Sequence, residues 1–375
     1  MGRGAAYWIP IVLSLALMAG LGFALRPYAM SGKNDFVALY AGAKLAGTAR
    51  LYDRQANLNE VKRAIGMTID SVVYTRPPFY AALLKPFALL PYRTAYAVFT
   101  AATLACFGWF VVRFASECRN LPFFAAMSVP MLIAVCGGQD TPFLLALTGC
   151  SILLARRGRN FAAGLVLSLC AIKFHLFVFI PLMLLMLRRW RVLAGGVTGG
   201  AVLFAIGLAA GGIHAWTDYI GVLRDPWINP LAIHMPNLHG FVASVSAPAW
   251  VEPGVIALVV AAFFWIARHR DVGYERPFAV SLICGLLTSF HSGLHDHVLL
   301  LAAFVLLERA SVPAVSRAVM AFILTPIPSL MAVADPPYSA VLPFALLMLV
   351  LLFCLGPLRV RPAAVAVPQF ETVPR

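Results

Sequence analysis

Apolar runs as long as a membrane-crossing helix dominate the sequence. The first, residues 7–25, contains no charged side chain. Inside a bilayer every backbone N–H and C=O group must be bonded within the protein, so only helices and closed barrels can cross it. The runs lack the period of two that barrel strands show, and 61% of the 375 residues are hydrophobic. We therefore predict an all-α polytopic membrane protein.

The spacing of the runs predicts about twelve transmembrane helices in one integral-membrane domain, residues 1–357. The predicted spans are 7–25, 94–112, 123–136, 142–155, 161–172, 176–187, 193–210, 251–267, 278–290, 298–307, 318–334 and 341–355. Residues 26–93 are expected to form a first extracytoplasmic loop with amphipathic interfacial or re-entrant helices, because apolar and basic residues are interleaved there. Residues 211–250 are expected to form the second such loop, and residues 358–375 a cytoplasmic tail.

The distribution of charged residues predicts the orientation in the membrane. If Met1 is cytoplasmic and the chain crosses at every span, arginines gather in the short cytoplasmic loops, as the positive-inside rule requires. Both termini would then be cytoplasmic in a plasma (inner) membrane protein, and the net charge of +14 needs no nucleic-acid partner. Seven of the eight histidines fall on the opposite side. We therefore expect the chemistry to face the periplasm or exterior.

Two of the predicted hairpins are too short to cross the bilayer fully. Arg159 and Lys173 are 14 residues apart, a helical length of about 21 Å against a hydrocarbon core of roughly 30 Å. Residues 276–291 and 297–309 form a similarly short pair. The polar residues at the tips of both hairpins should therefore lie below the outer surface and line one shared pocket: Lys173, His175, His291, His295 and His297.

Several polar motifs follow one another in a recognisable order. They are Asn34-Asp35-Phe36, Tyr40, Leu51-Tyr52-Asp53, Tyr74-Thr75-Arg76-Pro77-Pro78-Phe79, Gly138-Gln139-Asp140, 164–173 and 184–190. Together they resemble glycosyltransferase family 87, which comprises polyprenyl-phosphate-mannose-dependent mannosyltransferases and relatives with the GT-C membrane fold. The resemblance covers most of residues 35–193. The sequence departs from the family at Asp140, where asparagine is usual, and at Phe174, where proline commonly follows the lysine.

The resemblance implies that Asp35 is the catalytic base of an inverting transfer. A hexose, such as mannose, would move from a polyprenyl-phosphate donor to a lipid or glycan acceptor, and a carboxylate would take the proton from the attacking hydroxyl. The alternative for Asp35 is a helix N-cap, a common position for aspartate.

The departing phosphate would need fixed cations or hydrogen-bond donors, for which we propose Lys173, Arg76, His291 and His295. Lys173 could instead pair with a carboxylate, and Arg76 could anchor the chain at the interface.

Sugar or acceptor contacts are predicted at polar residues near these motifs: Asn34, Tyr40, Gln139, Asp140, His175 and His297. The cluster from His291 to His297 could alternatively hold a divalent metal or serve only for polar packing. We favour neither a metal nor another cofactor.

The rival functions are a secondary transporter or lipid flippase, and a structural membrane partner without chemistry. Transporters usually contain pseudo-repeats with broken helices at the midplane, and the sequence shows no such repeat. A submerged cluster of ionisable residues disfavours a purely structural role. The expected partners are therefore the donor, the acceptor and membrane lipids.

Overall fold

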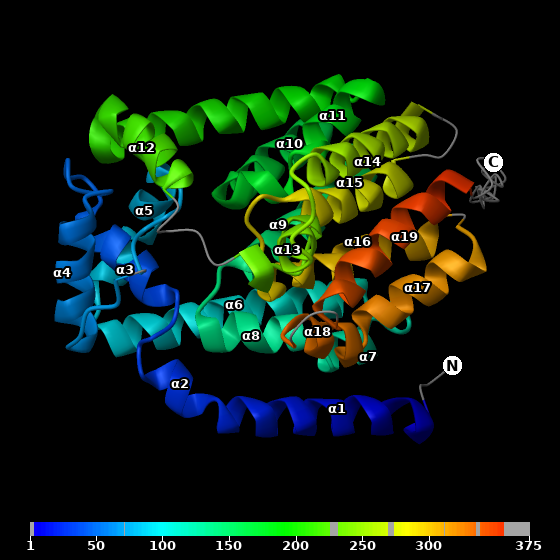
Figure 1. Ribbon diagram of the computed structural model, residues 1–375, viewed down its shortest axis with the longest axis horizontal. Helices are drawn as coiled ribbons and strands as arrows, with labels where there is room; N and C mark the ends of the chain where they lie inside the picture. The colour runs from blue at the N-terminus through cyan, green and yellow to red at the C-terminus, as the bar shows by residue number, and fades with distance from the viewer. Residues whose placement is uncertain are drawn as a thin grey trace, which may run out of the picture.

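The computed structural model describes residues 4–70, 72–225, 232–268, 274–310, 312–334 and 338–355, and all of its regular elements are helices. In Figure 1, α1 runs along the lower edge and α12 along the upper edge, with shorter helices between them. The start of α1 and the end of α19 both lie at the right of the view, and α3, α4 and α5 gather at the left. The predicted tail, residues 358–375, lies outside the described residues.

The helices are mostly short. Their bounds are α1 Ala5–Ala24, α2 Arg26–Met30, α3 Phe36–Leu45, α4 Arg54–Ile65, α5 Pro78–Leu84, η1 Lys85–Leu89, α6 Tyr92–Phe114, α7 Leu121–Ala126, α8 Val129–Gly137, α9 Thr141–Arg156, α10 Asn160–Ser168, η2 Leu169–Leu176, α11 Phe179–Met186, α12 Trp190–Arg224, η3 Ala232–His234, α13 Leu238–Ser244, α14 Val251–Arg268, α15 Glu275–Thr288, η5 Leu294–Leu299, α16 Leu300–Arg309, α17 Ala314–Leu324, α18 Pro326–Ala332, η6 Tyr338–Ala340 and α19 Val341–Leu355.

The all-helical membrane architecture is confirmed, whereas the count of about twelve spans is not. Among the described residues, five helices are long and apolar enough to cross a membrane, and the pair α17–α18, bent by 58°, could add a sixth. The long helices are α1, α6, α12, α14 and the stretch Tyr338–Leu355. Every other predicted span coincides with a helix that is shorter or broken. Prolines explain two breaks, because Pro130 and Pro326 lie in the first turns of α8 and α18 and lack the backbone N–H that a continuous helix would use.

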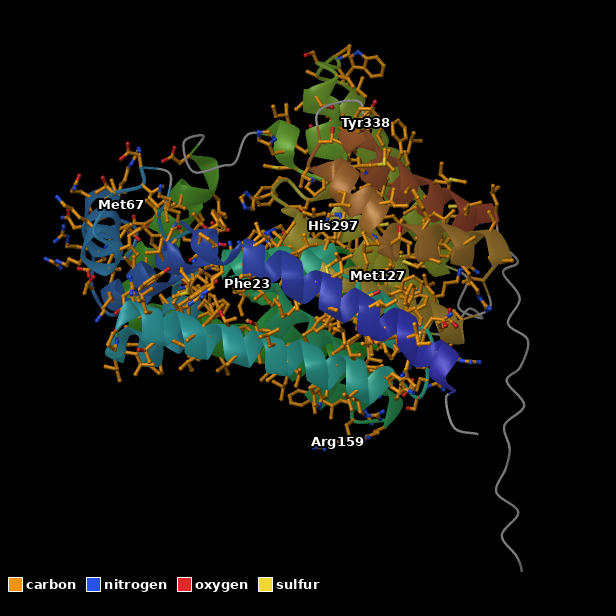
Figure 2. All side chains as sticks on the ribbon, turned by 90° about the horizontal axis from the view of Figure 1, so that it is seen from below. Phe23, Met67, Met127, Arg159, His297 and Tyr338 are labelled. Atoms are coloured by element: carbon orange, nitrogen blue, oxygen red, sulfur yellow. The ribbon has the colours of Figure 1, made fainter. Side chains whose placement is uncertain are left out.

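Residues 26–93, predicted to form the first extracytoplasmic loop, fold more compactly than expected. We predicted amphipathic helices on the membrane surface, but all residues of α3 except Ala38 and Lys44 are buried. This helix packs against α4, α5 and η1, so its apolar residues contact protein on every side. The next helix, α4, does have two faces: Leu58 and Val61 are buried, and Arg63 is exposed. Figure 2 shows α1 on the outside of the bundle, where Phe23 is largely exposed.

The two predicted short hairpins meet at their tips. In the first, α10 and η2 lead to Lys173, whose φ of −127° and ψ of 61° interrupt the helical turn before α11. In the second, α15 ends at Thr288 and the chain returns through η5 into α16. The ammonium of Lys173 lies 2.7 Å from a carboxylate oxygen of Asp296 in η5. The predicted meeting of the two tips is therefore confirmed.

A second polar cluster joins the opposite ends of the same helices. Arg156, the last residue of α9, donates to Glu117 at 2.6 Å and to Glu275, the first residue of α15, at 2.8 Å. Arg309, the last residue of α16, lies 3.4 Å from Glu117. Because α9 has 16 residues, the two polar clusters are separated by about 24 Å of apolar helix.

We predict that Arg156→Gln destabilises the protein by about 1–3 kcal/mol, because Glu117 and Glu275 would both lose a charged donor in a partly buried site. Thermal unfolding in detergent micelles measures the effect. Arg157→Gln is the matched control, because this neighbour is exposed and should change stability by less than about 0.5 kcal/mol. Equal unfolding midpoints for the two variants would show that the cluster contributes nothing.

Candidate functional site

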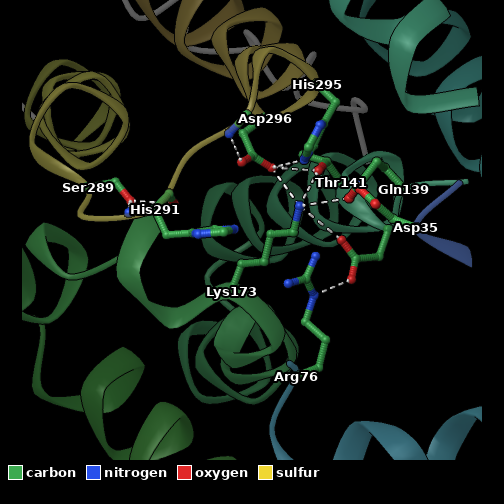
Figure 3. A network of polar contacts seen from close by, with 11 residues as sticks. Asp35, Arg76, Gln139, Thr141, Lys173, Ser289, His291, His295 and Asp296 are labelled. Atoms are coloured by element: carbon green, nitrogen blue, oxygen red, sulfur yellow. Dashed lines mark hydrogen bonds and ion pairs between the residues drawn. The ribbon is translucent and has the colours of Figure 1, made fainter. Parts of the chain in front are cut away.

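Lys173 lies at the centre of a buried polar network (Figure 3). Its side chain is only 2% exposed. Its ammonium lies 2.7 Å from Asp296 and 3.1 Å from Asp140, and it donates to Thr141 at 3.0 Å and Gln139 at 3.3 Å. An ammonium removed from water needs such partners, because burying it alone costs several kcal/mol. The network thus joins η2, the start of α9 and η5.

Asp140 pairs with Arg76, the second cation of the network. The guanidinium of Arg76 donates from Nε to Asp140 Oδ2 at 2.9 Å, and Asp140 is fully buried. Burial alone would raise the pKa of Asp140, but the charges of Arg76 and Lys173 outweigh burial and lower it to about 2. Asp140 also precedes the first residue of α9, where the helix dipole favours negative charge. The carboxylate is therefore ionised at any physiological pH.

Asp296 completes a balance of two cations and two carboxylates. One of its oxygens accepts from Lys173 and from the Thr141 hydroxyl at 2.8 Å, and the other accepts from the Gly293 backbone at 3.0 Å. Both carboxylate oxygens are therefore hydrogen-bonded. These hydrogen bonds stabilise a carboxylate that is only 1% exposed.

Asp35 joins the network through one side chain. The amide nitrogen of Gln139 donates to the Asp35 carboxylate, while the amide oxygen of Gln139 accepts from Lys173. Asp35 precedes the first residue of α3, but its side chain makes no capping hydrogen bond. The N-cap alternative is therefore wrong for this side chain.

The Asp35 carboxylate is both accessible and closely surrounded. Its side chain is exposed, yet the neighbouring protein displaces much of its water. This burial raises the pKa of Asp35 more than Arg76 and Lys173 lower it. Of the three carboxylates in the site, Asp35 is the accessible one, and its pKa shifts opposite to that of Asp140.

A close backbone contact holds Asp35 in place. The Asp35 N–H donates to the Gly137 carbonyl at 2.9 Å. Next to it, Gly138 has a φ of +64°, and a Cβ there would lie 2.5 Å from the Cβ of Phe36. The preceding Asn34 is also fixed, because its amide donates to Ala29 and its oxygen accepts from Tyr92. The turn before α9 and the turn before α3 therefore form one unit.

The histidines near the network are uncharged at neutral pH. Burial first, and then the charge of Arg76, lowers the pKa of His291 to about 4. Burial likewise lowers the pKa of His295 to about 3, and its ring lies 3.4 Å from Asp296. The positive charge of the site therefore comes from Arg76 and Lys173. A small cavity beside the network is lined by Arg76, Ile172, His175, Tyr219, Phe290 and His291.

Three residues predicted to bind sugar or acceptor make no contact with this network. Asn34 holds the turn described above, and the Tyr40 hydroxyl donates to the Leu90 carbonyl at 2.8 Å. His297 lines a different cavity beside Ser128 and Ser329. Because successive residues of a 3₁₀ helix point about 120° apart, His297 cannot face the same side as Asp296.

Two network residues, Thr141 and Asp296, were not predicted as site residues. Both have a signal in the sequence: Thr141 directly follows Gly138-Gln139-Asp140, and Asp296 stands between two histidines at a submerged tip. Among the described residues, no group of three or more His, Cys, Asp or Glu side chains is placed to hold a metal ion.

Comparison with known families gives one match. The sequence model of glycosyltransferase family 87 matches residues 74–294, more than half of the chain. The match includes Arg76, Asp140, Lys173 and His291, and it begins after Asp35. No curated protein and no solved structure is significantly similar to the chain.

We predict that Gly138→Ala destabilises the protein by about 1–3 kcal/mol, because the new Cβ would strain a left-handed backbone and press on Phe36. Gly66→Ala is the matched control, because Gly66 has a φ of +80° but open space around it. Alanine at position 66 would therefore suffer the backbone strain without a steric clash. Thermal unfolding of both variants measures the difference. A smaller loss for Gly138→Ala than for Gly66→Ala would contradict the close contact.

Proposed function

Because the chain belongs to glycosyltransferase family 87 and is therefore a membrane glycosyltransferase, we propose that it moves a hexose from a polyprenyl-phosphate donor. The acceptor would be the hydroxyl of a lipid or glycan on the extracytoplasmic side, and the transfer would invert the anomeric centre. Mannose is the sugar that the resemblance implies. The observation that carries the proposal is the accessible Asp35 carboxylate, joined through Gln139 to the buried cations.

In the proposed reaction Asp35 is the general base. Its carboxylate takes the proton of the acceptor hydroxyl while the hydroxyl oxygen bonds to the anomeric carbon. The bond between that carbon and the phosphate oxygen breaks, and its electron pair leaves with the phosphate. A raised pKa makes Asp35 a stronger base than an ordinary aspartate. The absence of a capping hydrogen bond leaves the carboxylate available for this work.

The departing phosphate would be held by Arg76 and His291. Arg76 uses Nε for Asp140, and its two terminal nitrogens have no hydrogen-bond partner among the described residues. Both residues line the small cavity beside the network. Arginine suits a phosphate because its donors match the phosphate oxygens in pairs, and a neutral His291 can add one donor.

Lys173 would act on the phosphate without leaving its carboxylates. Its ammonium is already shared among Asp140, Asp296, Thr141 and Gln139. We therefore propose that it stabilises the developing negative charge electrostatically and that His295 supports Asp296. Gln139 would orient Asp35, and His175 would border the phosphate or the sugar.

The proposal extends to the fold and to the topology. We propose a GT-C-type arrangement in which the short helices lie within the membrane alongside the five long ones. The arginine-rich cluster at Arg156 would face the cytoplasm, and the network around Lys173 would open to the exterior. Two observations support opposite faces for the two clusters and one common face for the start of α1 and the end of α19. The clusters occupy opposite ends of α9, α15 and α16, and α1 begins on the side where α19 ends (Figure 1).

We predict that Asp35→Asn lowers transfer from a labelled polyprenyl-phosphate hexose by about 10²–10⁴-fold, because the acceptor proton would have no base. Asp53→Asn is the matched control in the same segment, since Asp53 is a true N-cap and accepts from Ala56 at 2.6 Å. Asparagine also caps helices, so this variant should keep full activity. Undiminished transfer by Asp35→Asn would exclude the base, and flux of the donor across vesicles without transfer would favour a transporter.

The pH dependence of transfer should follow Asp35. The base must be ionised, so kcat should fall as pH is lowered through the raised pKa of Asp35. Gln139→Glu would place a second negative charge against Asp35, raise its pKa further and move this acid limb up by about one pH unit. Gln55→Glu makes the same charge change at an exposed site and should leave the profile unchanged. An unmoved acid limb in Gln139→Glu would contradict the role of Asp35 as base.

A further inference from the structure

An apolar groove leads away from the polar network along the flank of the bundle. It lies between α5, η1, α6, α9 and η2 and has a volume of about 590 Å³. Its walls include Leu83, Phe87, Trp109, Leu147 and Cys150. One of its helices, α6, is long and apolar enough to cross a membrane, so the groove lies where lipid chains would reach it. Sites of about 300–1,000 Å³ accommodate ligands of several hundred daltons.

The groove adjoins the cavity that contains Arg76. Ile172 lines both the groove and the cavity. The groove also reaches Tyr80, which is 4% exposed and whose hydroxyl has no hydrogen-bond partner among the described residues. Tyr80 lies in the first turn of α5, four residues after Arg76 in the sequence. An apolar groove with an unused polar group in its wall therefore shares a lining residue with the proposed phosphate site.

We propose that this groove holds the isoprenoid chain of the donor lipid, with the Tyr80 hydroxyl donating to the lipid phosphate that Arg76 binds. The inference rests on the proposed function and names the face through which the donor enters. In a bilayer the chain gains little from leaving other lipid tails, so the benefit is close packing and orientation. A chain aligned in the groove would point the anomeric carbon toward Asp35, which lowers the entropy cost of the reaction.

A second apolar groove provides an internal comparison. It has a volume of about 500 Å³, lies between α10, α11 and α12, and includes Val197 and Phe174. It shares no lining residue with the Arg76 cavity and reaches no unpartnered hydroxyl among the described residues. The two grooves therefore differ in their connection to the site and resemble each other in size and polarity.

The depth of the groove allows a test by chain length. Cys150 is nine residues beyond Thr141 in α9, a distance of about 14 Å along the helix. A two-isoprene donor would therefore end before Cys150, whereas a carrier of about ten units would pass it. Ala105, on the facing helix α6, is exposed and also lines the groove.

The experiment measures transfer from polyprenyl-phosphate hexoses of two chain lengths by the full-length protein. Ala105→Trp should raise KM for the long donor about tenfold and leave KM for the short donor unchanged, because tryptophan fills only the distal groove. Val197→Trp is the matched control, an exposed residue in the second groove, and should change neither value. Cys150→Trp tests the opposite wall of the first groove and should act like Ala105→Trp. Unchanged unfolding midpoints would show that each variant is folded.

The other outcomes separate the inference from the proposed function. If Val197→Trp rather than Ala105→Trp raises KM for the long donor, or if both donors respond equally, the inference is overturned while the proposed function stands. If the unmodified protein transfers sugar from neither donor, the proposed function itself fails. Labelling with a photoreactive polyprenyl phosphate gives a readout without turnover: adducts on α6 and α9 support the inference, and adducts confined to α10–α12 overturn it.

Discussion

The buried ammonium of Lys173 is the interaction on which the polar site depends. Taken out of water alone, such a charge costs several kcal/mol, so it remains charged only where acceptors surround it. Here they come from the start of α9 and from η5, with carboxylates at 2.7 and 3.1 Å. The two hairpins and the turn at Gln139 must therefore meet in one arrangement for any of these charges to be stable. A buried ion pair of this kind contributes little net stability, but it can select one arrangement of the helices around it.

The pairing of buried charges divides the site into a rigid support and a set of accessible groups. Lys173, Asp140 and Asp296 satisfy one another, so they form a rigid support with little capacity to spare for a ligand. Asp35 and the terminal nitrogens of Arg76 are the groups left available at its edge. Gln139 connects the two parts, because it touches Asp35 with its nitrogen and Lys173 with its oxygen. An enzyme can thus keep its reacting groups accessible while the support positions them.

Some features of the site could be predicted because they depend only on local distances. The number of residues between Arg159 and Lys173, multiplied by the helical rise, predicted a short hairpin whose tip meets the tip of the other short hairpin, and Lys173 does contact Asp296. The direction of a side chain around its helix was harder to predict. His297 was grouped with His291 and His295 by position in the sequence, yet it lines another cavity. Tyr40 and Asn34 were similarly plausible by motif, but their hydrogen bonds hold the backbone.

The sequence by itself determined that this is a helical membrane protein and which of its segments carry polar groups. Apolar run length and charge placement are properties of the chain alone. The sequence also singled out Asp35, Arg76, Asp140 and Lys173. Tertiary structure alone decided which carboxylates neutralise Lys173, which histidines lose their charge, and that α3 is enclosed by protein. These outcomes depend on packing between segments that are distant in the sequence, such as those of Lys173 and Asp296, which are 123 residues apart. Burial then sets both the partners and the pKa of each group.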